Sequence, residues 1–263
     1  MRRLAGSLLS TVLPASCQLC LNPLDNFSTI PVCPKCLHSV LPLEANFSCA
    51  GCRTPFLNPS PLDENGMCLL CSSGVNRFDA AYSYGVYDGE LRELIHLLKY
   101  QRVESLAKPL GRLLLRSLPS ETAYDAIVPV PLHWRRRFTR GFNQSQLLAR
   151  ALARSLHVPV LAALRRKRPT PAQSSLTGIA RRRNVRGAFQ IRSSQNIAGA
   201  SLLLVDDVFT TGATANACAM ELKAAGARRV TVLTVARADR RQWMQSLLEP
   251  AESPHKQFAK GAQ

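Results

Sequence analysis

The stretch LLLVDDVFTTGAT, from Leu202 to Thr214, constrains the fold of this chain more than any other. Four apolar residues are followed directly by two adjacent carboxylates, Asp206 and Asp207. A short run that is apolar throughout is typical of a strand buried on both faces of a parallel sheet. From Phe78 onward strand-like and helix-like patterns alternate, so we expect an α/β domain with helices on both faces of its sheet.

The elements expected around this stretch follow from apolar periodicity and from helix-terminating residues. Asn143 is the expected N-cap of one helix, and Gly226 is placed to end another. The expected strands cover 80–87, 124–131, 158–164, 187–191, 201–205 and 228–236, and the expected helices cover 89–101, 143–156 and 212–227.

The two carboxylates and the loop after them predict a ligand. In open parallel sheets ligands bind outside the carboxyl ends of the strands, where we expect Asp206 and Asp207. Two carboxylates can accept hydrogen bonds from a vicinal diol such as that of a ribose. The following residues, Thr210 to Thr214, surround Gly212 with hydroxyl groups and open a helix, which makes a nest for phosphate. Together they predict a ribose 5-phosphate.

Eight of the nine cysteines form four C-x-x-C pairs. Two such turns can bind one tetrahedral Zn²⁺, and the spacing between the pairs suits zinc ribbons. A disulfide scaffold would need an oxidising compartment, and a catalytic dithiol would need a single pair. We expect two structural zinc sites, paired either sequentially or as an interleaved cross-brace. The ligands would be Cys17, Cys20, Cys33, Cys36, Cys49, Cys52, Cys68 and Cys71.

Composition and apolar patterning divide the chain into three parts. Residues 16–74 contain few long apolar runs and many Pro and Asn, which predicts a small domain that depends on metal. That domain is either a platform for a partner or a cap over the next domain. Residues 78–238 form the expected α/β domain, and residues 239–263 a flexible tail.

The charge of the chain indicates a polyanionic partner. The formal net charge is +17, and the segment between Asp125 and Asp206 holds 15 Arg and Lys but no acidic residue. A coding bias would explain Arg in place of Lys, but not the missing acids.

Polar residues interrupt the apolar N-terminus, and no run of about 20 apolar residues follows. We therefore expect a cytoplasmic protein without a membrane span.

Residues 202–214 resemble the 5-phosphoribosyl-1-pyrophosphate (PRPP) signature of type I phosphoribosyltransferases over their whole length. With C-x-x-C pairs upstream, the chain resembles the ComF family, which is linked to DNA uptake in natural competence. Stretches 82–100, 128–149 and 173–189 support this, and the resemblance covers about residues 17–238. It implies a parallel-sheet type I phosphoribosyltransferase fold with a small N-terminal zinc-ribbon domain.

The resemblance also implies roles for individual residues. Asp206 and Asp207 would bind the ribose hydroxyls, and Mg²⁺ would bridge pyrophosphate and ribose. The basic stretch from Arg165 to Arg186 is similar to a loop that closes over pyrophosphate, although a basic loop touching nucleic acid is an equal alternative. The 5-phosphate would lie against Thr210, Thr211, Gly212, Ala213 and Thr214, the pyrophosphate against Pro131, Leu132 and His133, and the closing loop would contribute Gln173, Arg181, Asn184 and Arg186.

Single-stranded DNA is the expected polyanion. Trp134, Phe138 and Phe142 lie among basic residues and would either stack on bases or pack in the core. The candidate DNA contacts are Arg135, Arg136, Arg137, Arg140, Arg165, Arg166, Lys167 and Arg168.

Three functions fit these features. The first is a DNA-uptake factor that binds PRPP and single-stranded DNA, with a helicase or channel protein as a further partner. The second is a phosphoribosyltransferase (pentosyl transfer) for a small acceptor, with a purely structural zinc domain. The third is a regulator that senses PRPP without turnover. Thr210 stands where 6-oxopurine enzymes carry an acid, which argues against that acceptor class.

Overall fold

The computed structural model describes residues 16–24, 29–120, 122–133, 138–168, 185, 187–192, 196–239 and 241. Its helices are α2 (Pro34–His38), α3 (Leu69–Ser72), α4 (Gly89–Tyr100), the 3₁₀ helix η1 (Glu104–Leu106), α5 (Ala107–Ser117), α7 (Gln144–Leu156) and α9 (Ala213–Ala224). Its strands are β1 (Phe47–Ser48), β2 (Pro55–Phe56), β3 (Ala80–Val86), β4 (Ala126–Pro129), β5 (Leu164–Arg166), β6 (Phe189–Ile191), β7 (Ser201–Phe209) and β8 (Arg229–Arg237).

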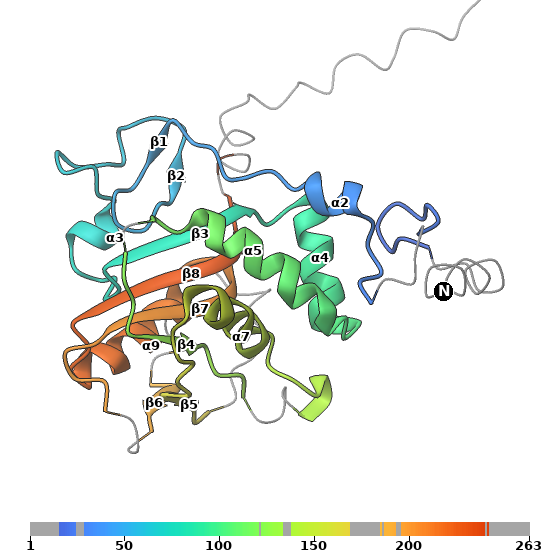
Figure 1. Cartoon of the computed structure of the whole chain (residues 1–263). Coiled ribbons are helices and arrows are strands. Elements are labelled where there is room, and N and C mark those ends of the chain that lie inside the picture. The colour runs from blue at the N-terminus through green and yellow to red at the C-terminus, as the bar shows by residue number, and fades with distance from the viewer. Residues whose placement is uncertain are drawn as a thin grey trace, which may run out of the picture.

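A parallel sheet of order β3-β8-β7-β4 forms the centre of the molecule (Figure 1). Its two middle strands, β7 and β8, have nine residues each. Leu202 to Val205 on β7 are fully buried, as expected for a central strand covered on both faces. The prediction of an α/β fold with a parallel sheet is confirmed.

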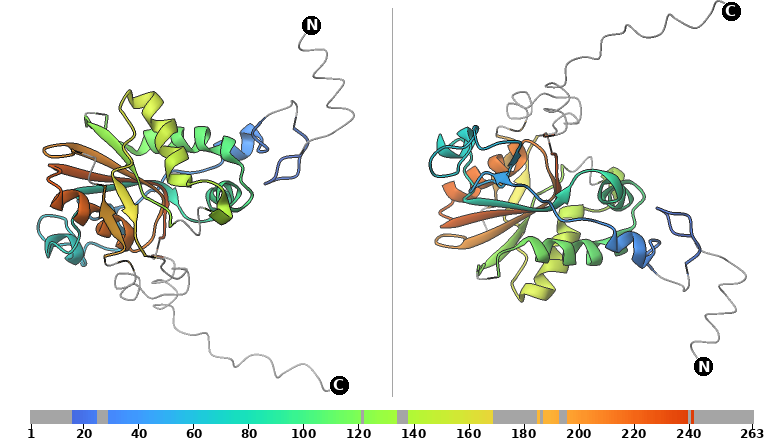
Figure 2. Two further views of the ribbon diagram at one scale, coloured as in Figure 1. Left: turned by 90° about the horizontal axis from the view of Figure 1, so that it is seen from below. Right: turned by 90° about the horizontal axis from the view of Figure 1, so that it is seen from above.

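Two apolar cores lie on opposite faces of this sheet, because successive side chains of a strand point to opposite sides. Leu203 and Val205 join a core with α4, α5 and α7. Leu202 and Leu204 join another core with α9. Figure 2 shows the corresponding layers, with α9 on one side of the sheet and the other three helices across from it.

Both predicted helix ends are confirmed. The Asn143 side chain accepts a hydrogen bond from the Ser145 N–H at 3.1 Å and caps α7. After α9, Gly226 has a φ of 93°. Its N–H donates to the Lys223 carbonyl, and the Ala227 N–H donates to the Leu222 carbonyl, which is a Schellman motif.

Two elements of the α/β domain differ from those expected. The expected strand 158–164 is reduced to a bridge between Val160 and Ile127, and the chain then forms β5, which pairs with β6 in an antiparallel ribbon. Helix α5, which contains Pro109 and Gly111, was not among the expected helices. Pro109 lies in the first turn, where no N–H is needed. Gly111 packs against α7, and a Cβ there would lie 2.8 Å from the Ala151 Cβ.

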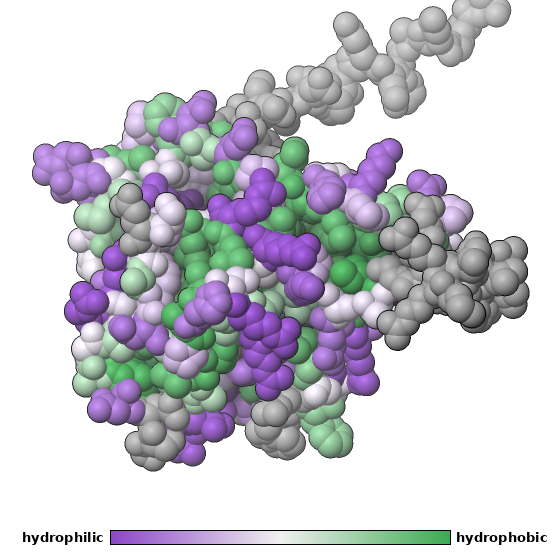
Figure 3. Space-filling view, in the orientation of Figure 1, coloured by the Kyte–Doolittle hydropathy of each residue, from purple (hydrophilic) through white to green (hydrophobic). Residues whose placement is uncertain are grey.

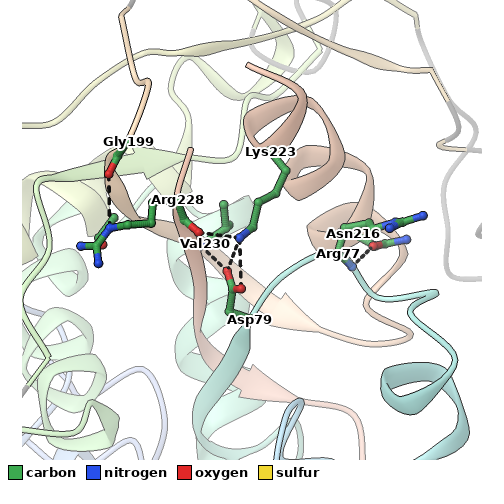
Figure 4. Close-up of polar contacts among 8 residues, drawn as sticks. Arg77, Asp79, Gly199, Asn216, Lys223, Arg228 and Val230 are labelled. Atoms are coloured by element: carbon green, nitrogen blue, oxygen red, sulfur yellow. Dashed lines mark hydrogen bonds and ion pairs between the residues drawn. The ribbon is translucent and has the colours of Figure 1, made fainter. Parts of the chain in front are cut away.

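Polar contacts anchor α9 to the amino-terminal ends of β3 and β8 (Figure 4). The Asp79 carboxylate accepts from the Val230 N–H at 2.6 Å and pairs with Lys223 Nζ at 2.8 Å. The Arg77 N–H donates to Asn216 Oδ1 at 2.7 Å. Residues just before β3 are therefore held against both the first turn of α9, at Asn216, and its last turn, at Lys223.

The molecular surface is mixed in character. On the face shown in Figure 3, strongly hydrophilic groups lie between apolar patches. Exposed large apolar side chains of the described residues include Leu21, Leu41, Tyr100 and Phe138.

Candidate functional site

The two adjacent carboxylates, Asp206 and Asp207, lie just past the point where β4 stops pairing with β7. Strand β4 pairs with β7 only as far as Pro129 and Val205, whereas β8 accompanies β7 to Phe209. Asp206 and Asp207 thus lie within β7. The sequence had suggested instead that the strand ends at Val205 and that the two carboxylates follow it. The edge that β4 leaves free opens beside them.

A cavity of about 630 Å³ lies at this edge. Segments that are far apart in sequence line it: the end of α4, the end of β4, the start of α7, and the end of β7 with the loop that follows, together with Arg166 on β5 and Thr234 on β8. Of the residues predicted to bind PRPP, those lining the cavity are Pro131, Leu132, Asp206, Asp207, Thr210, Gly212, Ala213 and Thr214.

Asp206 is held by hydrogen bonds on one side. Its Oδ1 accepts from Ser145 Oγ and from the Asp207 N–H, both at 2.9 Å. Burial and, after it, the Asp207 charge raise the pKa of Asp206 to about 7, while the two hydrogen bonds act in the opposite direction. A carboxylate fixed in this way keeps its other oxygen available to a ligand in the cavity.

Asp207 faces a cation that sequence reasoning missed. Lys99 Nζ from α4 lies 2.9 Å from Asp207 Oδ2, and the two side chains are 14% and 7% exposed. Burial lowers the pKa of Lys99, but the Asp207 charge outweighs it and the net shift is upward. Lys99 lay inside the stretch 82–100 that supports the family resemblance, but no role was predicted for it.

The hydroxyl-rich loop (Thr210–Thr214) leads from β7 into the first turn of α9. Gly212 adopts a φ of 71°, and a Cβ there would lie 2.7 Å from the Phe209 ring. Thr211 Oγ1 accepts from the Ala213 N–H at 3.4 Å. A helix N-terminus with hydroxyl groups beside it is suited to bind phosphate.

The other predicted site residues fall in different places. His133 is buried and, unlike Pro131 and Leu132, does not line the cavity; Thr211 does not line it either. Arg140 and Arg166 line the cavity. Arg165, Lys167 and Arg168 are exposed on or next to β5, and Phe138 is 87% exposed. Outside the described residues lie Trp134, Arg135, Arg136, Arg137, Gln173, Arg181, Asn184 and Arg186.

The cysteines gather in sequential order into two groups. The first cysteine group consists of Cys17, Cys20, Cys33 and Cys36, and the second of Cys49, Cys52, Cys68 and Cys71. In each group the four sulfurs lie within 4.8 Å of one another. The cross-brace alternative is not what the chain adopts.

The geometry of both groups fits zinc. Zn–S bonds of about 2.3 Å place tetrahedral sulfurs about 3.8 Å apart. Cys20 and Cys33 Sγ are 3.8 Å apart, and Cys52 and Cys68 Sγ are 3.7 Å apart. These distances are too long for disulfides. Backbone N–H groups also point at the sulfurs: that of Cys68 lies 3.3 Å from Cys49 Sγ. Hydrogen bonds from the other thiols hold the pKa of Cys49 well below its ordinary value.

Comparison with known proteins identifies a domain and several relatives. Residues 143–249 match the family model described as phosphoribosyl transferase domain. DNA utilization protein YhgH of Escherichia coli (strain K12) is 33% identical over 233 residues, which are 85% of this chain and 97% of the relative. Competence protein F of Haemophilus influenzae is 30% identical over 222 residues, or 78% of this chain and 97% of the relative.

Solved structures with a partial likeness to this chain include an adenine phosphoribosyltransferase and a PRPP amidotransferase. Adenine phosphoribosyltransferase from Leishmania donovani has a TM-score of 0.34 and 16% identity, covering 75% of this chain and 80% of that one. The PRPP amidotransferase from B. subtilis has a TM-score of 0.35 and 22% identity, covering 49% and 26%. Among the described residues, no helix is both long enough and apolar enough to cross a bilayer.

Proposed function

The chain belongs to the ComF family, with DNA utilization protein YhgH and competence protein F among its relatives, and from that premise we propose that it binds PRPP in the cavity and single-stranded DNA on the basic surface beside it. Its role would be in the uptake or use of DNA. The observation that carries the proposal is the convergence of segments distant in sequence on one cavity that is lined by a carboxylate pair.

Each part of PRPP has a partner of suitable chemistry in the cavity. Asp206 and Asp207 accept the two ribose hydroxyls. The hydroxyl-rich loop and the first turn of α9 hold the 5-phosphate. Pro131 and Leu132 lie next to the pyrophosphate, and Arg102 and Arg140 add positive charge to that wall. Mg²⁺ would offset the charge of the pyrophosphate and would be held mostly by PRPP and water.

The two cysteine groups are proposed to hold one Zn²⁺ each. A site of four thiolates has no open position, so its contribution is to folding rather than to chemistry. The segment 16–74 acts as a structural unit around the α/β domain.

The experiment that tests PRPP binding is calorimetry with PRPP and Mg²⁺. The variant Asp206→Asn with Asp207→Asn should weaken binding more than tenfold, because amides are poorer acceptors and half of each amide is a donor. Zinc content should stay unchanged, whereas the melting temperature should fall, because Lys99 loses its charge partner; affinities are therefore compared at a temperature where both proteins are folded. Equal affinity of the variant and the parent protein would overturn the assignment of the ribose site.

DNA binding is tested on the exposed basic residues next to β5. Replacing Arg165, Lys167 and Arg168 with alanine should weaken binding of an oligonucleotide and flatten its dependence on salt, because each phosphate contact releases counterions. A control of equal charge removes Lys108, Arg150 and Arg154, which are exposed on α5 and α7. Equal losses in the two variants would mean that binding follows net charge alone.

Turnover is followed by ³¹P NMR of PRPP with the zinc-loaded protein. Pyrophosphate that appears faster with single-stranded DNA than without it would support a transferase that acts with DNA. Pyrophosphate release that DNA does not change would be hydrolysis, with water taking the phosphoribosyl group to give ribose 5-phosphate, and would favour a transferase for a small acceptor in place of DNA. Bound PRPP without release would support a sensor.

A further inference from the structure

Lys99 is a buried cation in the wall of the cavity, on a helix whose other inward residues are apolar. Leu91, Leu94, Ile95 and Leu98 of α4 are all buried in the core that it shares with α5 and α7. Lys99 departs from this pattern, since its ammonium group pairs with Asp207 at 2.9 Å. Burial of an ammonium ion costs several kcal/mol unless a partner offsets it.

Packing alone does not account for this ion pair. A buried ion pair contributes little to stability, and apolar residues of similar volume can often replace it. Here both partners line the cavity. The Lys99 ammonium also lies 6.0 Å from the centre of the Tyr87 ring, so an aromatic wall limits its access to water. The pair is therefore positioned to meet a ligand.

The neighbouring carboxylates explain why a cation is needed. Asp206 and Asp207 are adjacent, and like charges at short range oppose each other's ionisation. A diol donates its hydrogen bonds, so both carboxyl groups must be acceptors when it binds. Lys99 lies against Asp207 and acts electrostatically on Asp206 as well.

We propose that Lys99 is a positioning residue that holds the Asp207 carboxylate in place at the cavity through their ion pair, and so makes the site selective for ribose 5-phosphates over 2-deoxyribose 5-phosphates. The proposal rests on the proposed PRPP site. A deoxyribose would place a CH₂ group against an ionised, desolvated carboxylate, which is costly. Selectivity of this kind would keep the sugar phosphates of DNA out of a cavity that lies beside a DNA-binding surface.

The test compares two commercially available probes, ribose 5-phosphate and 2-deoxyribose 5-phosphate, by calorimetry on the full zinc-loaded chain. The parent protein should prefer the ribose form by at least about tenfold, as expected when a polar site loses its partner. Lys99→Met should reduce that ratio to about threefold or less, and Lys99→Arg should restore it. Lys108→Met, on the exposed side of α5, is the matched control and should leave the ratio unchanged.

A pH profile separates this role from a structural one. The charged groups that line the cavity with Asp206 are Asp207, Lys99, Arg102, Arg140 and Arg166. Ser145 on α7 and the buried thiol of Cys218 on α9 are neutral neighbours. Affinity for ribose 5-phosphate should rise as the pH increases through about 7, where Asp206 ionises. Without the Lys99 cation that rise should move to higher pH, whereas a loosened helix would lower affinity at every pH.

The outcomes distinguish the two proposals. If the parent protein binds neither PRPP nor ribose 5-phosphate, the proposed function fails. If it binds both, but Lys99→Met keeps the parent selectivity and pH profile, the role of Lys99 alone is overturned. Lys99→Gln, which can still donate a hydrogen bond to Asp207 without a charge, provides the same comparison if the methionine variant does not fold.

Discussion

The two cysteine groups have the same C-x-x-C geometry but lie in different surroundings. Cys17 and Cys36 of the first group belong to the core shared with α4, α5 and α7. Cys49, Cys52 and Cys68 of the second group belong to the core on the opposite face, with α9. The same local motif is thus used to brace both faces of one sheet.

The first group is held at the edge of the molecule. Cys20 is exposed, and Cys33 is partly exposed. One tie to the α/β domain is the bond from Ser105 Oγ to the Thr29 carbonyl at 2.6 Å. Another is the bond from Tyr84 Oη to the Val40 carbonyl at 3.1 Å.

The second group is connected to the cavity wall through a series of contacts. The Ala81 N–H on β3 donates to the Gly51 carbonyl, and Phe78 packs edge-on against Phe209 at 6.0 Å between ring centres. The Phe209 ring in turn lies under Gly212 and 4.7 Å from the Arg237 guanidinium carbon. We infer that the second group supports the hydroxyl-rich loop, while the first group supports the helix that carries Lys99.

The largest effect is expected from loss of a zinc ligand. Cys52→Ser should cost more than about 4 kcal/mol of stability and abolish PRPP binding, because Cys52 is a buried ligand within the core that contains Phe209. Cys20→Ser, at an exposed ligand of the first group, should cost about half as much. Zinc analysis and guanidinium unfolding measure both, and equal costs would remove the distinction between the groups.

Next in size is an effect on the hydroxyl-rich loop. Gly212→Ala should cost about 2 kcal/mol, from its positive φ and from contact with Phe209, and should weaken PRPP binding. Gly74→Ala is the control, since Gly74 has a φ of 67° and no described atom within 4 Å of the added Cβ. Thermal unfolding should separate the two variants. Identical costs would show that Phe209 does not support the loop.

A smaller effect is expected at Arg237, which is 1% exposed. Among the described residues its Nη1 and Nη2 have no hydrogen-bond partner, while the thiols of Cys52 and Cys49 act on it electrostatically. Arg237→Met should weaken metal binding at the second group by about tenfold, as for other groups around a metal site. ¹¹³Cd NMR of the cadmium-loaded protein can follow each group separately, and a loss at the first group as well would contradict the assignment.

The smallest effect is expected at the edge of the first group. Ser105→Ala should cost about 1 kcal/mol through loss of one hydrogen bond, and should speed zinc release from the first group alone. Ser117→Ala is a suitable control, because its hydroxyl bonds within α5 to the Leu114 carbonyl. A chelator competition assay would show whether zinc release differs between the two variants.

Much of the site was predictable from local sequence. The apolar run before Asp206 and Asp207 predicted a central strand, and the residues after it predicted a loop into a helix. Asn143 and Gly226 marked helix ends correctly because capping depends on residues a few positions apart. The four C-x-x-C pairs predicted two metal sites for the same reason.

The elements that were missed or wrongly expected depend on contacts with residues outside their own segments. Helix α5 contains Pro109 and Gly111, which count against a helix by propensity, yet burial of Leu110 and Leu114 against α7 stabilises it. The expected strand after α7 is reduced to a bridge, because only Val160 pairs with the edge of β4.

By itself the sequence determined the chemistry available to this protein: an acid pair, a hydroxyl-rich loop, eight paired cysteines and an excess of positive charge. Only the tertiary structure decided which of these groups lie next to one another. The sheet brings Lys99 to Asp207, places one cysteine group on each face and opens the cavity where β4 ends before β7. The reason is physical: local motifs are set by backbone geometry over a few residues, whereas an ion pair between distant elements depends on how a whole core packs.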